Sequence, residues 1–142
     1  MKAITLVLFS FIIINGTHAQ TILKDVDDVT KHAESIMAQL KKKDIEKSYD
    51  LLNKYWLTPD EYRYETELLE VDEFDTNTKG FGKVIGAELI EKKQVKDVLI
   101  RMKYLLRFEN GAIYIKIGYY KNEFGWIVNE FDTTDNMDGL YR

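Results

Sequence analysis

The sequence predicts an α+β fold in which N-terminal helices pack on a curved, four-stranded antiparallel sheet. Two patterns predict it. Between about residues 25 and 70, apolar residues recur at helical spacing, whereas from about residue 83 to residue 131 they alternate with polar ones. The helical half comes before the sheet half, and this order is typical of α+β domains rather than of βαβ units.

The first 19 residues have the pattern of a secretory signal peptide. Lys2 is followed by an apolar run and then by Thr17-His18-Ala19, which puts small residues before Gln20. The run is shorter than the roughly 20 apolar residues that a membrane-spanning helix needs, so an uncleaved anchor is the less favoured alternative. We expect cleavage after Ala19 and export to a bacterial periplasm or to the extracellular space.

Cleavage would leave a single domain over residues 20–142. Lys2 is the only charged residue in the removed segment, so the net charge would change from −4 to −5. An acidic chain disfavours a nucleic acid or an anionic membrane surface as partner. The chain has no cysteine, so no disulfide can form and the apolar core must supply the stability.

A first helix is expected over residues 25–43, with Asp25 as its N-cap and Lys41-Lys42-Lys43 at the negative end of its dipole. Its apolar stripe is formed by Val26, Val29, Ala33, Ile36, Met37 and Leu40. Asp44 can cap a second helix, whose buried side would carry Tyr49 and Leu52.

Thr58-Pro59-Asp60-Glu61 predicts the start of a third helix that runs to about Leu69. Thr58 would be the N-cap, Pro59 would occupy the first helical position, and Glu61 would complete a capping box. Polar residues and two glycines over residues 72–82 predict a loop.

Four strands are expected over residues 83–91, 97–109, 112–121 and 124–131. Asn110-Gly111 predicts a two-residue type I′ turn between the second and third strands. This turn would place apolar residues opposite one another in the pairs Phe108–Ile113, Leu106–Ile115, Tyr104–Ile117 and Met102–Tyr119.

A turn centred on Asn122-Glu123 would join the last two strands. Tyr119 would then face Trp126, and Glu130 would face Ile115 on the apolar face of the sheet. A frayed, polar tail is expected over residues 132–142.

The second face of the sheet has a mixed composition, in which cations alternate with apolar residues. It could be a solvated face whose long cations cover apolar neighbours. It could instead be a partner surface, with homodimerisation as its simplest form, because Tyr and Arg are enriched at interfaces. The residues expected to form that surface are Arg101, Arg107, Tyr114, Tyr120 and Phe131.

Three stretches give the chain a likeness to a known fold. They are AESIMAQLKKKDIEKSY over Ala33–Tyr49, Gly82-Lys83-Val84-Ile85-Gly86, and Gly125-Trp126-Ile127-Val128 followed by Phe131. On these residues the chain resembles the nuclear transport factor 2-like, or cystatin-like, α+β superfamily, and within it small exported bacterial domains of unknown function. The resemblance implies a cone, in which a curved sheet wraps around the first helix. It implies no activity, because that fold carries enzymes and non-enzymatic modules alike.

The residue types present limit the chemistry. His32 is the one histidine after the signal segment, and a lone helical histidine is expected at the surface or at the boundary of the buried stripe. One histidine without cysteine cannot form a transition-metal site of the usual kind, so no metal and no cofactor is expected. Glu130 is the candidate catalytic residue, since a carboxylate on an apolar face would have a raised pKa. The favoured alternative is that the strand frays or twists there and leaves Glu130 in water.

Two functions follow from these observations. The leading hypothesis is a non-enzymatic exported domain that binds a partner protein, a second copy of itself, or a small apolar ligand. Such a ligand would occupy a cone mouth ringed by Tyr55, Trp56, Tyr104, Tyr119 and Trp126. The alternative is a small isomerase- or hydratase-like enzyme that uses Glu130 and a tyrosine.

Overall fold

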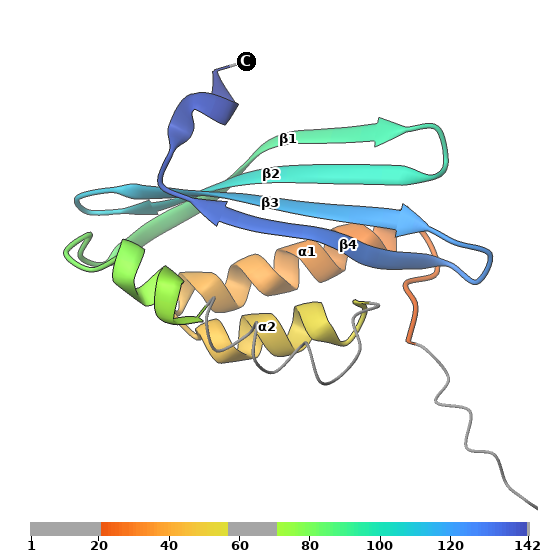
Figure 1. Ribbon diagram of the computed structural model, residues 1–142, viewed down its shortest axis with the longest axis horizontal. Coiled ribbons are helices and arrows are strands. Elements are labelled where there is room, and N and C mark those ends of the chain that lie inside the picture. Colours follow the sequence, from red (N-terminus) through yellow and green to blue (C-terminus); the bar gives the residue numbers. More distant parts are fainter. Residues whose placement is uncertain (1–20, 57–70, 142) are drawn as a thin grey trace, which may run out of the picture.

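The computed structural model describes residues 21–56 and 71–141 (Figure 1). The predicted signal segment and the predicted third helix lie outside these residues. Helix α1 spans Val26–Lys41 and helix α2 spans Ile45–Asn53. Both N-caps are the predicted ones, because the side chain of Asp25 accepts a hydrogen bond from the Asp28 N–H and that of Asp44 accepts one from the Lys47 N–H.

Residues 71–77 are helical, so the loop predicted from residue 72 is wrong over its first part. Val71, Phe74 and Thr78 share the spacing of one helix face, and that face packs toward the core. Phe74 is 2% exposed and its carbonyl accepts a hydrogen bond from the Thr78 N–H at 3.0 Å. Three apolar or small residues at helical spacing were enough to bury this turn, although acidic residues separate them.

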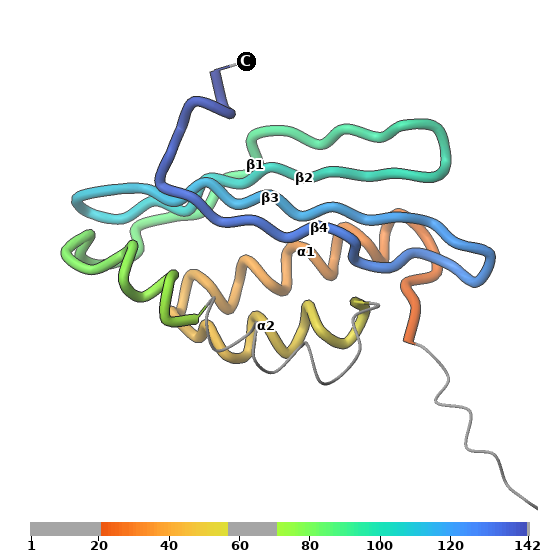
Figure 2. The backbone as a smooth tube through the Cα atoms, in the orientation of Figure 1, coloured from red at the N-terminus to blue at the C-terminus, as the bar shows by residue number. Residues whose placement is uncertain are grey.

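Four antiparallel strands follow in chain order and pair with their neighbours. They are β1 (Val84–Val95), β2 (Leu99–Phe108), β3 (Ala112–Lys121) and β4 (Trp126–Thr134). The sheet is open, and α1 and α2 lie on the same side of it (Figures 1 and 2). The predicted fold class, α+β with helices packed on a four-stranded antiparallel sheet, is confirmed.

The two faces of the sheet differ sharply in composition. The inner face, which the helices cover, carries Ile100, Met102, Tyr104 and Leu106 on β2. The outer face carries Arg101, Lys103, Leu105 and Arg107 on the same strand. The buried inner residues of the remaining strands are Ile113, Ile115, Ile117, Tyr119, Trp126 and Val128. They pack against the α1 stripe in one apolar core.

The hairpin between β2 and β3 is shifted by two residues from the predicted register. The Phe108 N–H donates to the Gly111 carbonyl at 2.9 Å, so Glu109 and Asn110 form the two-residue loop. Leu106 lies opposite Ile113 rather than opposite Ile115. An even shift keeps every side chain on its predicted face, which is why the inner face was still predicted correctly.

A close approach by Phe81 accounts for this shift. A Cβ atom on Gly111 would lie 2.7 Å from atoms of the Phe81 ring, and the Asn110 N–H donates to the Phe81 carbonyl at 2.9 Å. Gly111 therefore gives space to a neighbouring ring, and no positive φ angle is found at Asn110 or Gly111. The dipeptide has the composition of a type I′ turn without forming one.

The hairpin between β3 and β4 also differs from the prediction. The Asn122 N–H donates to the Gly125 carbonyl at 2.9 Å, and Trp126 lies opposite Lys121 rather than opposite Tyr119. The side-chain oxygen of Asn122 accepts hydrogen bonds from the N–H groups of Phe124 and Gly125. This side-chain cap favours a loop placed one residue further along the chain.

A β-bulge then exchanges the faces of the two residues that follow it. Glu130 pairs with Gly118, but Val128 pairs with Tyr119, so Asn129 is an extra residue in β4. The predicted places of Glu130 and Phe131 are therefore both wrong. Glu130 lies on the outer face, and Phe131 lies on the inner face with its ring 5.5 Å from that of Tyr49.

The C-terminal tail is more ordered than predicted. Strand β4 continues to Thr134, and a 3₁₀ helix, η1, spans Met137–Leu140. Its N-cap Asn136 accepts a hydrogen bond from the Asp138 N–H at 2.9 Å. Gly139 lies over the ring of Tyr114, which is 6% exposed as a result.

Main-chain segments from the N-terminal half cover the outer edge of β4. Leu23 and Trp126 exchange two backbone hydrogen bonds of 2.9 and 2.8 Å, and the Val128 N–H donates to the Tyr55 carbonyl at 3.0 Å. The segment before α1 and the end of α2 are therefore held beside the same strand. This arrangement leaves a hollow between them.

Candidate functional site

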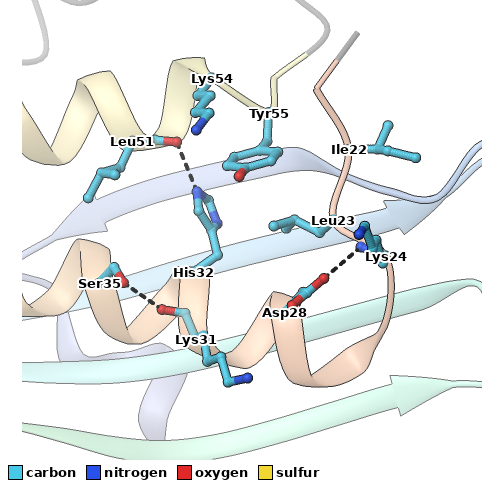
Figure 3. Close-up of a pocket in the computed structure, with 10 residues that line it drawn as sticks. All are labelled: Ile22, Leu23, Lys24, Asp28, Lys31, His32, Ser35, Leu51, Lys54 and Tyr55. Carbon is cyan, nitrogen blue, oxygen red and sulfur yellow. Dashed lines mark hydrogen bonds between the residues drawn. The ribbon is translucent and has the colours of Figure 1, made fainter.

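The hollow is a pocket of about 380 Å³ between α1, the end of α2 and the segment before α1 (Figure 3). Its size falls within the range of small-molecule sites. The residues that line it are Ile22, Leu23, Lys24, Asp28, Lys31, His32, Ser35, Leu51, Lys54 and Tyr55. Helix α1 supplies only polar residues to the lining, whereas the N-terminal segment and the end of α2 supply the apolar residues together with Lys24 and Lys54.

His32 lies in the wall of the pocket and is 6% exposed, so it is buried rather than at the surface or at the boundary of the buried stripe, as was expected. Its Nε2 atom is 2.8 Å from the Leu51 carbonyl oxygen and its Nδ1 atom is 2.9 Å from the Tyr119 hydroxyl. A carbonyl can only accept, so Nε2 carries the proton and donates it to Leu51. In the neutral ring Nδ1 then accepts from the Tyr119 O–H.

The surroundings of this histidine keep it neutral. Burial lowers the pKa of His32 from its ordinary value, the Leu51 carbonyl acts in the opposite direction, and the charge of Lys54 lowers it further. Burial also raises the pKa of Tyr119 well above its usual range. Because both ring nitrogens are engaged by the protein, His32 ties α1 to α2 and β3 and has no free nitrogen for proton transfer to a ligand.

Three lysines stand around the pocket, and one carboxylate accompanies them. Lys24, Lys31 and Lys54 are exposed, and Asp28 accepts a hydrogen bond from the Lys24 backbone N–H at 3.1 Å. The ammonium of Lys54 is 5.5 Å from the centre of the Tyr55 ring, so it also makes a cation–π contact. The pocket is therefore locally positive in a chain whose net charge is −4.

The five aromatic residues that the sequence placed around a ligand do not form one ring. Tyr55 lines the pocket, with its ring 4.7 Å from that of His32, and Tyr119 lies behind that histidine. Tyr104 and Trp126 are buried in the core at 5% and 1% exposure. Trp56 is half-buried and pairs with Val128 at the edge of β4.

Burial favours the protonated form of the two inner tyrosines, Tyr104 and Tyr119. It raises the pKa of Tyr104 to about 12, with a smaller contribution from the charge of Glu34. Tyr104 and Tyr119 therefore stay protonated at any physiological pH and serve as hydrogen-bond donors.

Glu130, the candidate catalytic residue, lies on the outer face and is paired with two cations. Its carboxylate is 2.8 Å from Arg101 Nε and 3.1 Å from Lys116 Nζ. Partial burial acts to raise the pKa of Glu130, but the hydrogen bonds from Lys116 and Arg101 outweigh it and hold that pKa below its ordinary value. The raised pKa expected of a general base is not found here.

Gly118 makes this bridge possible. It lies between Arg101 and Glu130 in one cross-strand row, and a Cβ atom on it would come within 2.7 Å of the Glu130 Cβ and 2.9 Å of Glu130 Oε2. The glutamate therefore crosses β3 where no side chain stands, and reaches a cation on β2.

The residues expected to form a partner surface occupy different environments. Arg101 pairs with Glu130, and the Arg107 guanidinium is 2.8 Å from Glu88 Oε1. Tyr114 is buried under η1 and Phe131 is on the inner face, so Tyr120, at 44% exposure, is the one exposed aromatic residue of this set.

Sequence reasoning missed the role of His32, although its position carried a signal. It follows Val29 by three residues and precedes Ile36 by four, so it lies within the apolar stripe of α1. Its partners Leu51 and Tyr119 are distant in sequence, and no pattern in the sequence indicates them.

Comparison with known proteins gives no relative. No family model matches the chain, and neither the curated proteins nor the solved structures contain a match. The resemblance to the nuclear transport factor 2-like superfamily therefore remains a prediction.

Two further findings concern the residues that the structure describes. Within residues 21–56 and 71–141, no cluster of histidine and acidic side chains could hold a metal ion. In the same ranges, no helix has the length and apolar character needed to cross a membrane.

Proposed function

We propose that this protein is an exported, non-enzymatic binding domain whose ligand is a small molecule with an apolar body and an anionic group. The observation that carries the proposal is the pocket beside His32. There Lys24, Lys31 and Lys54 surround an apolar wall with Asp28 as the one acidic lining residue, although the chain as a whole is acidic.

The two halves of the pocket match the two halves of such a ligand. Ile22, Leu51 and the Tyr55 ring offer an apolar surface for an aliphatic or aromatic body. The lysine ammonium groups can pair with a carboxylate, sulfonate or phosphate at the pocket rim. Since the remainder of the chain repels anions, the local excess of cations directs an anion to this place.

The rigidity of the pocket also supports binding. His32 holds α2 against α1 and β3 through its two hydrogen bonds, so the pocket walls are fixed before a ligand arrives. A preformed site loses less conformational entropy on binding than a flexible one.

The geometry gives less support to an isomerase or hydratase. Glu130 is tied to two cations on the opposite face of the sheet, and the ring nitrogens of His32 are both used within the protein.

Export rests on the pattern of residues 1–19, and its destination is the periplasm or the extracellular space.

Titration of the purified protein with octanoate, followed by ¹H–¹⁵N and aromatic NMR spectra, tests the proposal. Octanoate should shift the signals of Tyr55 and His32, and the variant Lys31→Glu/Lys54→Glu should bind it at least about tenfold more weakly. Lys42→Glu/Lys47→Glu is the matched control, since it makes the same change in net charge at two exposed lysines that do not line the pocket.

Octylamine, which has the same chain and the opposite charge, provides the second arm. Octanoate that causes no shifts, or octylamine that binds as tightly as octanoate, would contradict the proposed ligand class. Equal weakening by Lys42→Glu/Lys47→Glu would show that only the overall charge of the protein matters.

A further inference from the structure

An apolar row crosses the outer face of the sheet near the β1–β2 turn. Val95 lies opposite Leu99, Leu99 opposite Tyr120, and Tyr120 opposite Ile127, so the row runs over all four strands. Ile127 is 3% exposed, whereas Val95, Leu99 and Tyr120 are 57%, 40% and 44% exposed. Val98, in the turn, adds a further exposed side chain of 42%. We call these five residues the outer apolar row.

The next two rows of the outer face contain almost only charged residues, and these residues are paired with one another. Glu91 bridges Lys93 and Lys103 at 3.0 Å each, and Lys116 bridges Glu130 and Asp132 at 3.1 and 3.2 Å. A hollow of about 240 Å³ lies where these rows meet the outer apolar row. It is lined by Glu91, Lys93, Val95, Leu99, Ile100, Arg101, Lys103, Asn129 and Glu130.

This arrangement has the anatomy of a small protein interface. Apolar side chains and a tyrosine form the centre, an arginine stands beside them, and paired charges form the rim. An exposed apolar group of this kind, bordered by polar residues, is uncommon on a surface that stays in water.

The charge balance indicates which partner fits. The described outer-face cations are Lys93, Arg101, Lys103, Arg107 and Lys116, and the carboxylates are Glu88, Glu91, Glu130 and Asp132. The positive and negative charges of this face nearly cancel. A strongly acidic or strongly basic partner could therefore pair with only about half of the charged residues. A second copy of the same face presents both signs in nearly equal measure, so two acidic chains can approach each other there with little repulsion between the facing surfaces.

We propose that the outer apolar row binds the same row of a second copy of this chain, with the two sheets face to face. The contact is isologous, so each exposed residue of the row serves both protomers, while the buried Ile127 supports the row from within its own sheet. The exposed side chains are few, and the dimer is accordingly weak and dependent on concentration. The pocket beside His32 is lined by residues of α1 and α2, which lie on the other side of the sheet (Figure 1), so it stays open in this dimer.

Sedimentation equilibrium of the full chain, from about 10 µM to about 1 mM, tests this interface. We expect a monomer–dimer equilibrium that Val95→Lys weakens by at least about tenfold. Leu89→Lys is the matched control: both residues lie on β1 and are about half exposed, but Leu89 pairs with the inner-face Tyr104. Leu89→Lys should leave the dimer unchanged.

Each other outcome overturns the proposal. A protein that stays monomeric at every concentration does not form this interface. The proposal is then wrong even if the row binds an unrelated protein. If both Val95→Lys and Leu89→Lys abolish the dimer, the two copies pair along the edge of β1. If neither variant weakens the dimer, its interface lies elsewhere on the protein. Tyr120→Ser replaces Val95→Lys if circular dichroism shows that the lysine variant does not fold.

Discussion

The two faces of the same sheet are stabilised in different ways. On the inner face, residues such as Met102, Leu106 and Ile117 are fully buried, and their contribution depends on area and packing. On the outer face, Glu130 joins Arg101 and Lys116 through hydrogen bonds that require defined positions. One strand can therefore contribute to non-directional apolar packing on one side and to directional ion pairs on the other.

The largest effect should come from a matched pair of leucines next to each other on β2. Leu106→Ala on the inner face should lower the free energy of unfolding by about 2–5 kcal/mol, because it leaves a cavity in the packed core. Leu105→Ala on the half-buried outer face should cost roughly half as much or less. Urea unfolding measures both, and equal losses would contradict the assignment of the two faces.

A smaller effect is expected from replacing His32, which lies on α1 beneath the inner face of the sheet. His32→Gln should cost about 1–3 kcal/mol near neutral pH, because the Tyr119 hydroxyl and the Leu51 carbonyl lose well-placed partners. The cost should also depend on pH. The pKa of His32 is lowered in the folded state, so the unfolded chain binds more protons as the pH falls below the ordinary value of 6.5.

The contribution of His32 is thus complete above pH 6.5 and is lost as the pH falls through the lower folded-state pKa. Thermal unfolding of both proteins between about pH 7.5 and about pH 5.5 measures this. The difference in Tm should narrow toward the acidic end. A difference that stays constant over that range would show that the imidazole is not buried in its neutral form.

The smallest effect is expected on the outer face. Glu130→Gln removes the charge that joins Arg101 and Lys116, and should cost about 0.5–1.5 kcal/mol at low salt and less at high salt. Because the pKa of Glu130 is lowered in the fold, its contribution is present above the ordinary value of 4.5 and is lost as the pH falls through the folded value. Salt-independent loss would assign the effect to packing instead.

The sequence was sufficient for features that depend on near neighbours. Asp25 and Asp44 cap the helices they were expected to cap, because an N-cap bonds to an N–H three residues away. The inner face of β2 and β3 followed from alternation alone, and it survived a two-residue error in register since the side-chain period of a strand is two.

Features that depend on distant contacts were not predictable. The register of the β2–β3 hairpin is fixed by the Phe81 ring over Gly111, a contact that no local pattern encodes. The bulge at Asn129 places Glu130 on the outer face and Phe131 on the inner face, the reverse of the prediction, because one extra residue reverses the alternation that follows it.

The candidate site was predicted least well, for the same reason. Tyr55 was singled out as a ligand residue and does line the pocket, but Lys24, Lys31 and Lys54 were not among the predicted site residues. They come from three segments that are separate in the sequence, because Lys31 lies on α1, Lys54 follows α2, and Lys24 lies in the segment that the Leu23–Trp126 bridge holds.

That bridge has a consequence for the order of events during synthesis. Leu23, four residues after the predicted cleavage point, pairs with Trp126, which is among the last parts of the chain to be made. Leu23 therefore cannot dock until the final hairpin exists. The wall of the pocket that Ile22, Leu23 and Lys24 supply is accordingly completed only after the strands have been made.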